Sequence, residues 1–189
     1  MKSRKLSFVV AGPALFAAVL VCGTAYSQES QRVACPSPMH VSLKANGPSA
    51  STPFAADFPA SLQAPSATFG QTAANHVLRH TFTWKPAGEC CQYISGTLVL
   101  QYKALQGGPA GSSTSANDMV GIYSNGAGVS GAGKNLYTGA VTTGQSGTVT
   151  IALTPAMLAN NRLSFAVEDD TSVTQASIDV IGCCVNPKR

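Results

Sequence analysis

Short runs in which apolar and polar residues alternate are the feature that most constrains this chain. The run at 39–45 places Met39, Val41 and Leu43 on one side and polar residues on the other. Because successive side chains of a strand point to opposite faces, this pattern predicts a half-buried strand. Comparable runs, separated by turn-forming segments, occupy 77–85, 93–105, 118–124, 135–142, 148–153, 162–167 and 173–185.

These runs predict an all-β fold of about eight short strands. The strands alternate with loops and not with helices, which argues against a parallel α/β sheet. One short helical turn is expected at 156–159, with Thr154 as N-cap and Pro155 at its first position. Segment 46–68 holds four prolines among Ala and Ser and is expected to be irregular. We predict an antiparallel β-sandwich, with the jelly roll as the candidate topology.

The N-terminal 27 residues have the pattern of a secretory signal peptide. Lys2, Arg4 and Lys5 precede an apolar stretch, and Ala25 and Ser27 are small residues before a cut at Gln28. A cut after Ala25 and an uncleaved anchor are the alternatives. We therefore predict a secreted or periplasmic protein with one β-sandwich domain at 28–189 and no membrane span after cleavage.

The charge of the chain depends largely on this segment. The full chain has a net charge of +4, and charged residues make up 11% of it, against about 25% in typical soluble domains. Without the three basic residues of the signal, nine basic residues face eight acidic ones, a net charge of +1. No basic patch remains, and we predict no nucleic-acid partner.

Five cysteines follow the signal: Cys35, Cys90, Cys91, Cys183 and Cys184. In an oxidising compartment we expect disulfides, with one cysteine of this odd set unpaired. First and last strands of a sandwich often pair antiparallel, which would place Cys35 beside the pair at 183–184. We predict one bridge from Cys35 to that pair and a second from Cys90 or Cys91 to its other member.

Candidate metal ligands are few. The chain has no HExxH and no Cys-x-x-Cys motif, so the histidines at 40, 76 and 80 and the adjacent cysteines are interpreted as structural. Asp169 and Asp170 follow a strand within an acidic turn, where oxygen ligands can hold calcium. A solvated turn with local capping is the favoured interpretation, and calcium at Asp169 and Asp170 is the alternative. We predict no other cofactor.

Catalytic motifs are equally scarce. Ser130 and Ser146 lack the second glycine of a nucleophile elbow, and the glycine-rich segment 125–133 lacks the Lys-Ser/Thr ending of a phosphate loop. Glu89 and Glu168 are the two glutamates of the predicted domain beyond its N-terminus, so an acidic pair for glycoside cleavage has little support. A non-enzymatic protein is favoured.

Aromatic residues offer a further kind of site. Trp84 shares its strand face with Leu78 and Phe82 and is expected in the core. Tyr123 and Tyr137 flank the glycine-rich loop and are the candidates for exposed contact with a glycan. We predict a binding or adhesion module of the cell envelope whose partner is a glycan, by analogy to the fold, or another envelope protein. A structural surface or matrix subunit is the alternative, and a hydrolase with an acidic pair is the least favoured.

Overall fold

The computed structural model describes residues 38–47, 52–62, 66–85, 91–109, 118–168 and 170–184. All of them belong to one compact unit, Ala34–Arg189. The predicted signal peptide, Cys35, Cys90 and Asp169 lie outside these residues. Within them, no helix is long and apolar enough to cross a membrane.

Antiparallel strands make up almost all of the regular structure. Their bounds, with those of the three short helical segments, are β1 Pro38–Asn46, η1 Ala55–Asp57, η2 Ala60–Leu62, β2 Leu78–Thr83, β3 Cys91–Ala104, β4 Met119–Ser124, β5 Ala127–Gly128, β6 Lys134–Asn135, β7 Ser146–Leu153, α1 Pro155–Leu158, β8 Arg162–Val167 and β9 Thr171–Cys184.

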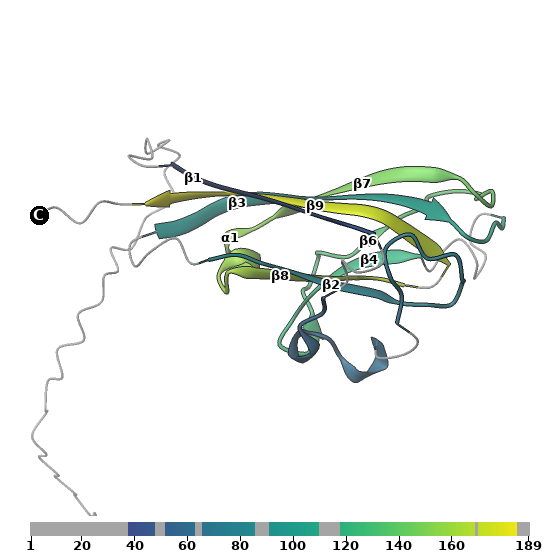
Figure 1. Ribbon diagram of the computed structural model, residues 1–189, viewed down its shortest axis with the longest axis horizontal. Coiled ribbons are helices and arrows are strands. Elements are labelled where there is room, and N and C mark those ends of the chain that lie inside the picture. The colour runs from purple at the N-terminus through teal and green to yellow at the C-terminus, as the bar shows by residue number, and fades with distance from the viewer. Residues whose placement is uncertain are drawn as a thin grey trace, which may run out of the picture. The chain divides into compact units, whose positions relative to one another are not determined.

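The strands form two sheets that lie one above the other (Figure 1). The first sheet has the order β1-β9-β3-β7, and the second has the order β2-β8-β4-β5, with β6 also paired to β4. β5 and β6 pair with opposite ends of β4 and together act as one edge strand. Pairing therefore runs inward from the two ends of the chain: β1 with β9, β2 with β8, β3 with β7, and β4 with β5 and β6. This is the winding of a jelly roll, so the predicted fold class is confirmed.

The space between the sheets is filled by the inward-facing side chains of both. In β3, Leu98 and Leu100 are fully buried, while their neighbours Thr97 and Val99 are only half-buried. Ile178 of β9 is the register partner of Leu98 and lies on the same inner face. The alternation of apolar and polar residues in the sequence therefore corresponds to the inner and outer faces of each strand. The inner faces of the second sheet close the core with Leu78, Phe82, Val120, Ile122, Leu163, Phe165 and Val167.

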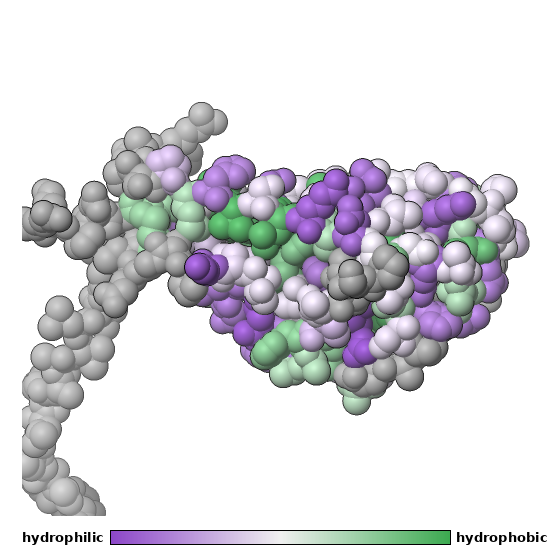
Figure 2. All heavy atoms as spheres, in the orientation of Figure 1, coloured by the Kyte–Doolittle hydropathy of each residue, from purple (hydrophilic) through white to green (hydrophobic). Residues whose placement is uncertain are grey.

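The two outer faces differ. In the second sheet, the connection between β1 and β2 crosses the outer face, where Phe58 and Leu62 pack against Ala166 of β8 in a small second core. In the first sheet, the outer positions of β1 are exposed, from His40 to Lys44. Figure 2 shows polar surface interrupted by apolar surface along β1, where Val41 and Leu43 are half-buried against the core.

Two predictions about secondary structure need correction: the strand at 135–142 and the N-cap of the helical turn. The strand predicted at 135–142 is absent, because Leu136 and Tyr137 are buried in succession. In this segment only Lys134–Asn135 pairs with a strand, β4, and Val141 forms an isolated bridge with Gly108. The helical turn is present at Pro155–Leu158, but Thr154 occupies its N-cap without a side-chain hydrogen bond. Trp84 is half-buried against the core, where its indole N–H donates to the hydroxyl of Tyr93 at 2.9 Å.

The pairing of β1 with β9 is confirmed, and it places Pro38 opposite Cys183. A disulfide joins Cys91 of β3 to Cys184 of β9, register partners whose Cα atoms are 4.0 Å apart. This is one of the four pairings predicted for the second bridge, which join Cys90 or Cys91 to Cys183 or Cys184. Cys183 is also disulfide-bonded, to a cysteine outside the described residues. That Cys183 pairs with Cys35 remains a prediction.

Candidate functional site

Tyr137 does not offer a surface for a ligand. It is 7% exposed, and its ring lies edge-on to Tyr102, with ring centroids 5.4 Å apart. Its hydroxyl lies 3.1 Å from the hydroxyl of Thr171. Burial raises the pKa of Tyr137 to about 12. The exposure expected for this residue is wrong, because the segment around it turns into the sandwich and does not continue the glycine-rich loop.

Tyr123 lies on the outer face of the second sheet and is half-buried. A side chain at Gly121 would come within 2.8 Å of its ring, so the ring lies flat over a position without a Cβ. Phe58 packs beside the ring at 5.6 Å between centroids, and the Tyr123 hydroxyl donates to Glu168 at 3.3 Å. Burial, together with the charge of Glu168, raises the Tyr123 pKa to about 12. The Tyr123 ring is therefore held in place by these contacts and is not free to stack on a ligand.

Asp170 is buried, at 3% exposure, and does not lie in a solvated turn. Its Oδ1 accepts the backbone N–H of Asn75 at 3.3 Å, and its own backbone N–H donates to Oδ1 of Asp118 at 3.0 Å. These bonds tie the start of β9 to distant parts of the chain. In the part of the chain that the structure describes, no three His, Cys, Asp or Glu side chains gather closely enough to hold a metal ion. The calcium prediction gains no support from these residues.

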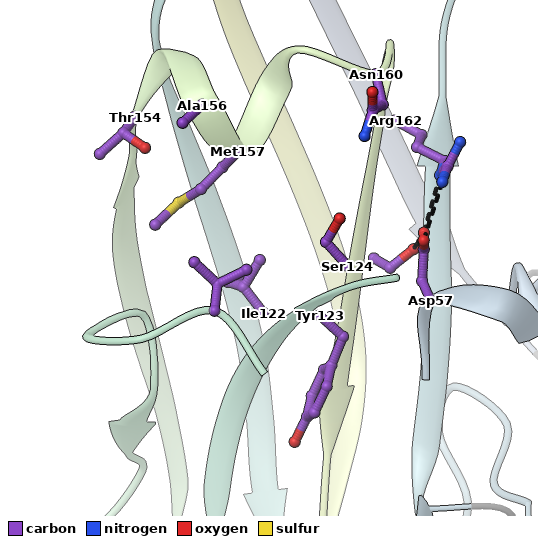
Figure 3. Close-up of a pocket in the computed structure, with 11 residues that line it drawn as sticks. Asp57, Ile122, Tyr123, Ser124, Thr154, Ala156, Met157, Asn160 and Arg162 are labelled. Atoms are coloured by element: carbon purple, nitrogen blue, oxygen red, sulfur yellow. Dashed lines mark hydrogen bonds and ion pairs between the residues drawn. The ribbon is translucent and has the colours of Figure 1, made fainter. Parts of the chain in front are cut away.

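A cavity of about 110 Å³ lies between α1, the end of β4 and the start of β8 (Figure 3). One end is apolar, lined by Met157, Ile122 and Val129. The polar lining residues Asn160, Arg162, Asp57 and Ser124 lie on the side away from Met157 (Figure 3), and Ser164 is hydrogen-bonded to Asp57 there. Figure 3 shows the side chain of Met157 pointing from α1 toward Ile122, while the ring of Tyr123 extends away from α1. An apolar end and a polar end in one cavity suit an amphipathic ligand.

Asp57 organises the polar end. It is 2% exposed, and Arg162 donates to both of its oxygens, from Nε at 2.9 Å and from Nη2 at 3.0 Å. Ser164 donates to Oδ2 at 2.6 Å and the backbone N–H of Asn125 donates to Oδ1 at 3.2 Å. Four donors therefore occupy the carboxylate: three come from β8 and one from the turn after β4, so they fasten the long β1–β2 connection, which carries Asp57, to both.

The ionisation of this group follows from its partners. Burial acts to raise the pKa of Asp57, but the hydrogen bonds from Arg162, Ser164 and Asn125 outweigh it and hold the pKa below its usual value. The hydrogen bond to Asp57 raises the pKa of Arg162 in turn. A carboxylate with a lowered pKa and four donors is a poor general base, so this arrangement favours binding over proton transfer.

Phe54 extends the site at the surface. Its ring lies over the guanidinium of Arg162, 4.3 Å from the ring centroid, and it is 45% exposed. Its backbone N–H donates to the Thr81 hydroxyl at 2.8 Å, which fixes the start of the connection. A held, exposed aromatic ring beside hydrogen-bonding groups is the kind of surface that stacks on the apolar face of a sugar.

The sequence did not reveal these residues. Asp57 and Arg162 are 105 positions apart, and no local spacing connects them. The available signal was that Phe54, Asp57 and Phe58 interrupt the Ala, Pro and Ser composition of 46–68. Aromatic residues in an irregular segment indicate that it packs against the domain. Among known proteins, no family model, no curated protein and no solved structure matches this chain significantly.

Proposed function

We propose that the protein is a non-catalytic binding module of the cell envelope, secreted or periplasmic, whose ligand is a carbohydrate. The observation that carries this proposal is the cavity below α1 with Phe54 beside it. It combines an exposed aromatic ring and apolar side chains, which suit the apolar face of a sugar ring, with uncharged hydrogen-bonding side chains, which suit its hydroxyl groups. The signal-like N-terminal segment and the Cys91–Cys184 disulfide support the placement outside the cytoplasm.

The test is binding to a glycan array, followed by titration of the best ligand by calorimetry. Replacing Phe54 by Ala removes the proposed stacking surface, and we expect at least about a tenfold loss of affinity, or 1.4 kcal/mol. Ile94→Ala is the matched control, because Ile94 is 49% exposed but lies on β3 of the other sheet. Equal loss in both variants, or no binding to any glycan by the parent, would reject the proposal.

A structural subunit is the second candidate. Ile94 and Ile181 are exposed at 49% and 42% on the outer face of the first sheet. They are near neighbours, since Ile181 pairs with Ser95 at a register shift in β3. Neighbouring exposed apolar side chains favour contact with another protein surface. Covalent dimers on a non-reducing gel, or assemblies abolished by Ile181→Lys, would favour this role.

A further inference from the structure

The charges around the cavity restrict the class of sugar that it accepts. Arg162 is its only lining cation among the described residues, and Asp57 neutralises it through two hydrogen bonds. The carboxylate of Glu168 accepts a hydrogen bond of 3.3 Å from the hydroxyl of Tyr123, which lines the cavity. Arg79 lies on the same outer face, with its guanidinium 6.0 Å from the ring centroid of Phe58, so the formal charges of Asp57, Arg162, Glu168 and Arg79 sum to zero. An acidic ligand would therefore meet a lining guanidinium that is already paired with Asp57.

The polar groups left for a ligand are uncharged. Both oxygens of Asp57 are filled by four donors, so the carboxylate has little capacity to accept from a sugar hydroxyl. The side chains of Asn160, Thr154 and Ser124 line the cavity, and no hydrogen bond to them is formed within the described part of the chain. Amide and hydroxyl groups donate and accept equally well, which matches the hydroxyls of a neutral sugar.

The size of the cavity limits how much of a ligand enters. At about 110 Å³, it is well below the roughly 300–1,000 Å³ of pockets that enclose a drug-sized molecule. A cavity of this size has room for one edge of a single sugar unit and not for the whole ring. From charge, chemistry and size together, we infer that the site takes one uncharged sugar unit and that Asp57 is the residue that sets this selectivity. The inference rests on the proposed function.

The experiment compares matched ligands of the same ring stereochemistry that carry either a hydroxymethyl group or a carboxylate at carbon 6. Methyl glucoside and methyl galactoside are titrated against the uronic acids of the same stereochemistry, with two-dimensional NMR following the backbone amides of Phe54 and Asn160. We expect the neutral sugars to bind at least about tenfold more tightly than their acids, since an acid loses the hydration of its carboxylate while the paired Arg162 offers little positive charge in return. Equal or tighter binding of the acids overturns the inference and leaves the proposed function standing. Binding of neither class rejects both the site and the function.

Variants locate the selectivity. Asp57→Asn leaves Arg162 with its charge exposed to the ligand, and we expect the preference to shift about tenfold toward the acids. Because this change also weakens the fold, Glu168→Gln serves as the second variant: it removes a negative charge without touching the ion pair, and a shift in the same direction is expected. Asp179→Asn, on the outer face of the first sheet, is the control and should change nothing. An unchanged preference in both Asp57→Asn and Glu168→Gln contradicts the assignment.

Discussion

The two sheets of the sandwich share one core but differ in what lies on their outer faces. The outer face of the second sheet carries a second layer, formed by η1 and η2, with its own apolar cluster and an ion pair whose carboxylate is buried. The described outer positions of the first sheet include exposed polar side chains, such as Thr150 and Lys103, and the two exposed apolar side chains Ile94 and Ile181. The candidate site lies on the covered sheet, where distant segments converge and their polar groups are held in place.

This difference teaches that the irregular β1–β2 connection is a structural layer and not a simple linker. Its Phe58 and Leu62 are as buried as many strand residues, at 4% and 7% exposure. Its Asp57 reaches β8 and the turn after β4. The first sheet depends instead on long strand pairing and on the Cys91–Cys184 disulfide. Substitutions on the two outer faces should therefore have very different consequences.

The largest contrast is expected for apolar truncation. Phe58→Ala removes a ring that packs against Tyr123 and Leu62, and we expect the free energy of unfolding to fall by about 3–5 kcal/mol. Ile94→Ala, on the exposed outer face of β3, should cost less than about 1 kcal/mol. Urea denaturation followed by circular dichroism measures both. Similar losses in the two variants would show that the β1–β2 connection does not form a second core.

A second contrast concerns carboxylates. Asp57→Ala leaves Arg162, Ser164 and a backbone N–H without their acceptor, and the expected loss of stability is about 3 kcal/mol. Asp179→Ala, an outward residue of β9, should stay within about 0.5 kcal/mol of the parent. The comparison uses the same denaturation measurement.

The pH dependence of the free energy of unfolding provides a separate test of the Asp57–Arg162 ion pair. Because the pKa of Asp57 is lower in the folded state than in the unfolded chain, its contribution is complete above the unfolded pKa near 3.8. It is lost as the pH falls through the folded pKa, where the carboxylate protonates. The parent should therefore lose stability below about pH 4 more steeply than Asp57→Ala does. Identical acid profiles would contradict the assigned role of the ion pair.

The strands were predictable because each needs only local information. At 162–167 the alternation of Leu163, Phe165 and Val167 located the strand at its observed bounds. The failure at 135–142 came from tertiary bonds: the backbone carbonyl of Leu136 accepts the Tyr102 hydroxyl, and its N–H donates to Asp118. Those contacts bury Leu136 and Tyr137 together and override the weak alternation.

The candidate site was less predictable than the strands. Tyr123 was expected at a binding surface and does line the cavity, but Arg162 appeared only as the polar start of a strand. A site assembled from a connection, a turn and two strands leaves no spacing in the sequence. The physical reason is that an ion pair such as Asp57–Arg162 is specified by the register of β2 on β8 and by how the connection folds across them.

The smallest contrast appears at high pH and concerns Tyr123. Its pKa is raised from 10.0 to about 12 in the folded protein by burial and by Glu168. Below pH 10 both states keep the phenol proton, and this contribution to stability is complete. Between pH 10 and 12 the unfolded chain loses the proton first, so the free energy of unfolding falls by about 1–3 kcal/mol. Tyr123→Phe should reduce this alkaline loss without abolishing it, because Tyr137 has a similarly raised pKa inside the sandwich. Stability measured by urea denaturation from pH 9 to 12 tests this, and an equal slope in parent and variant would mean that the covered face admits water to the Tyr123 hydroxyl.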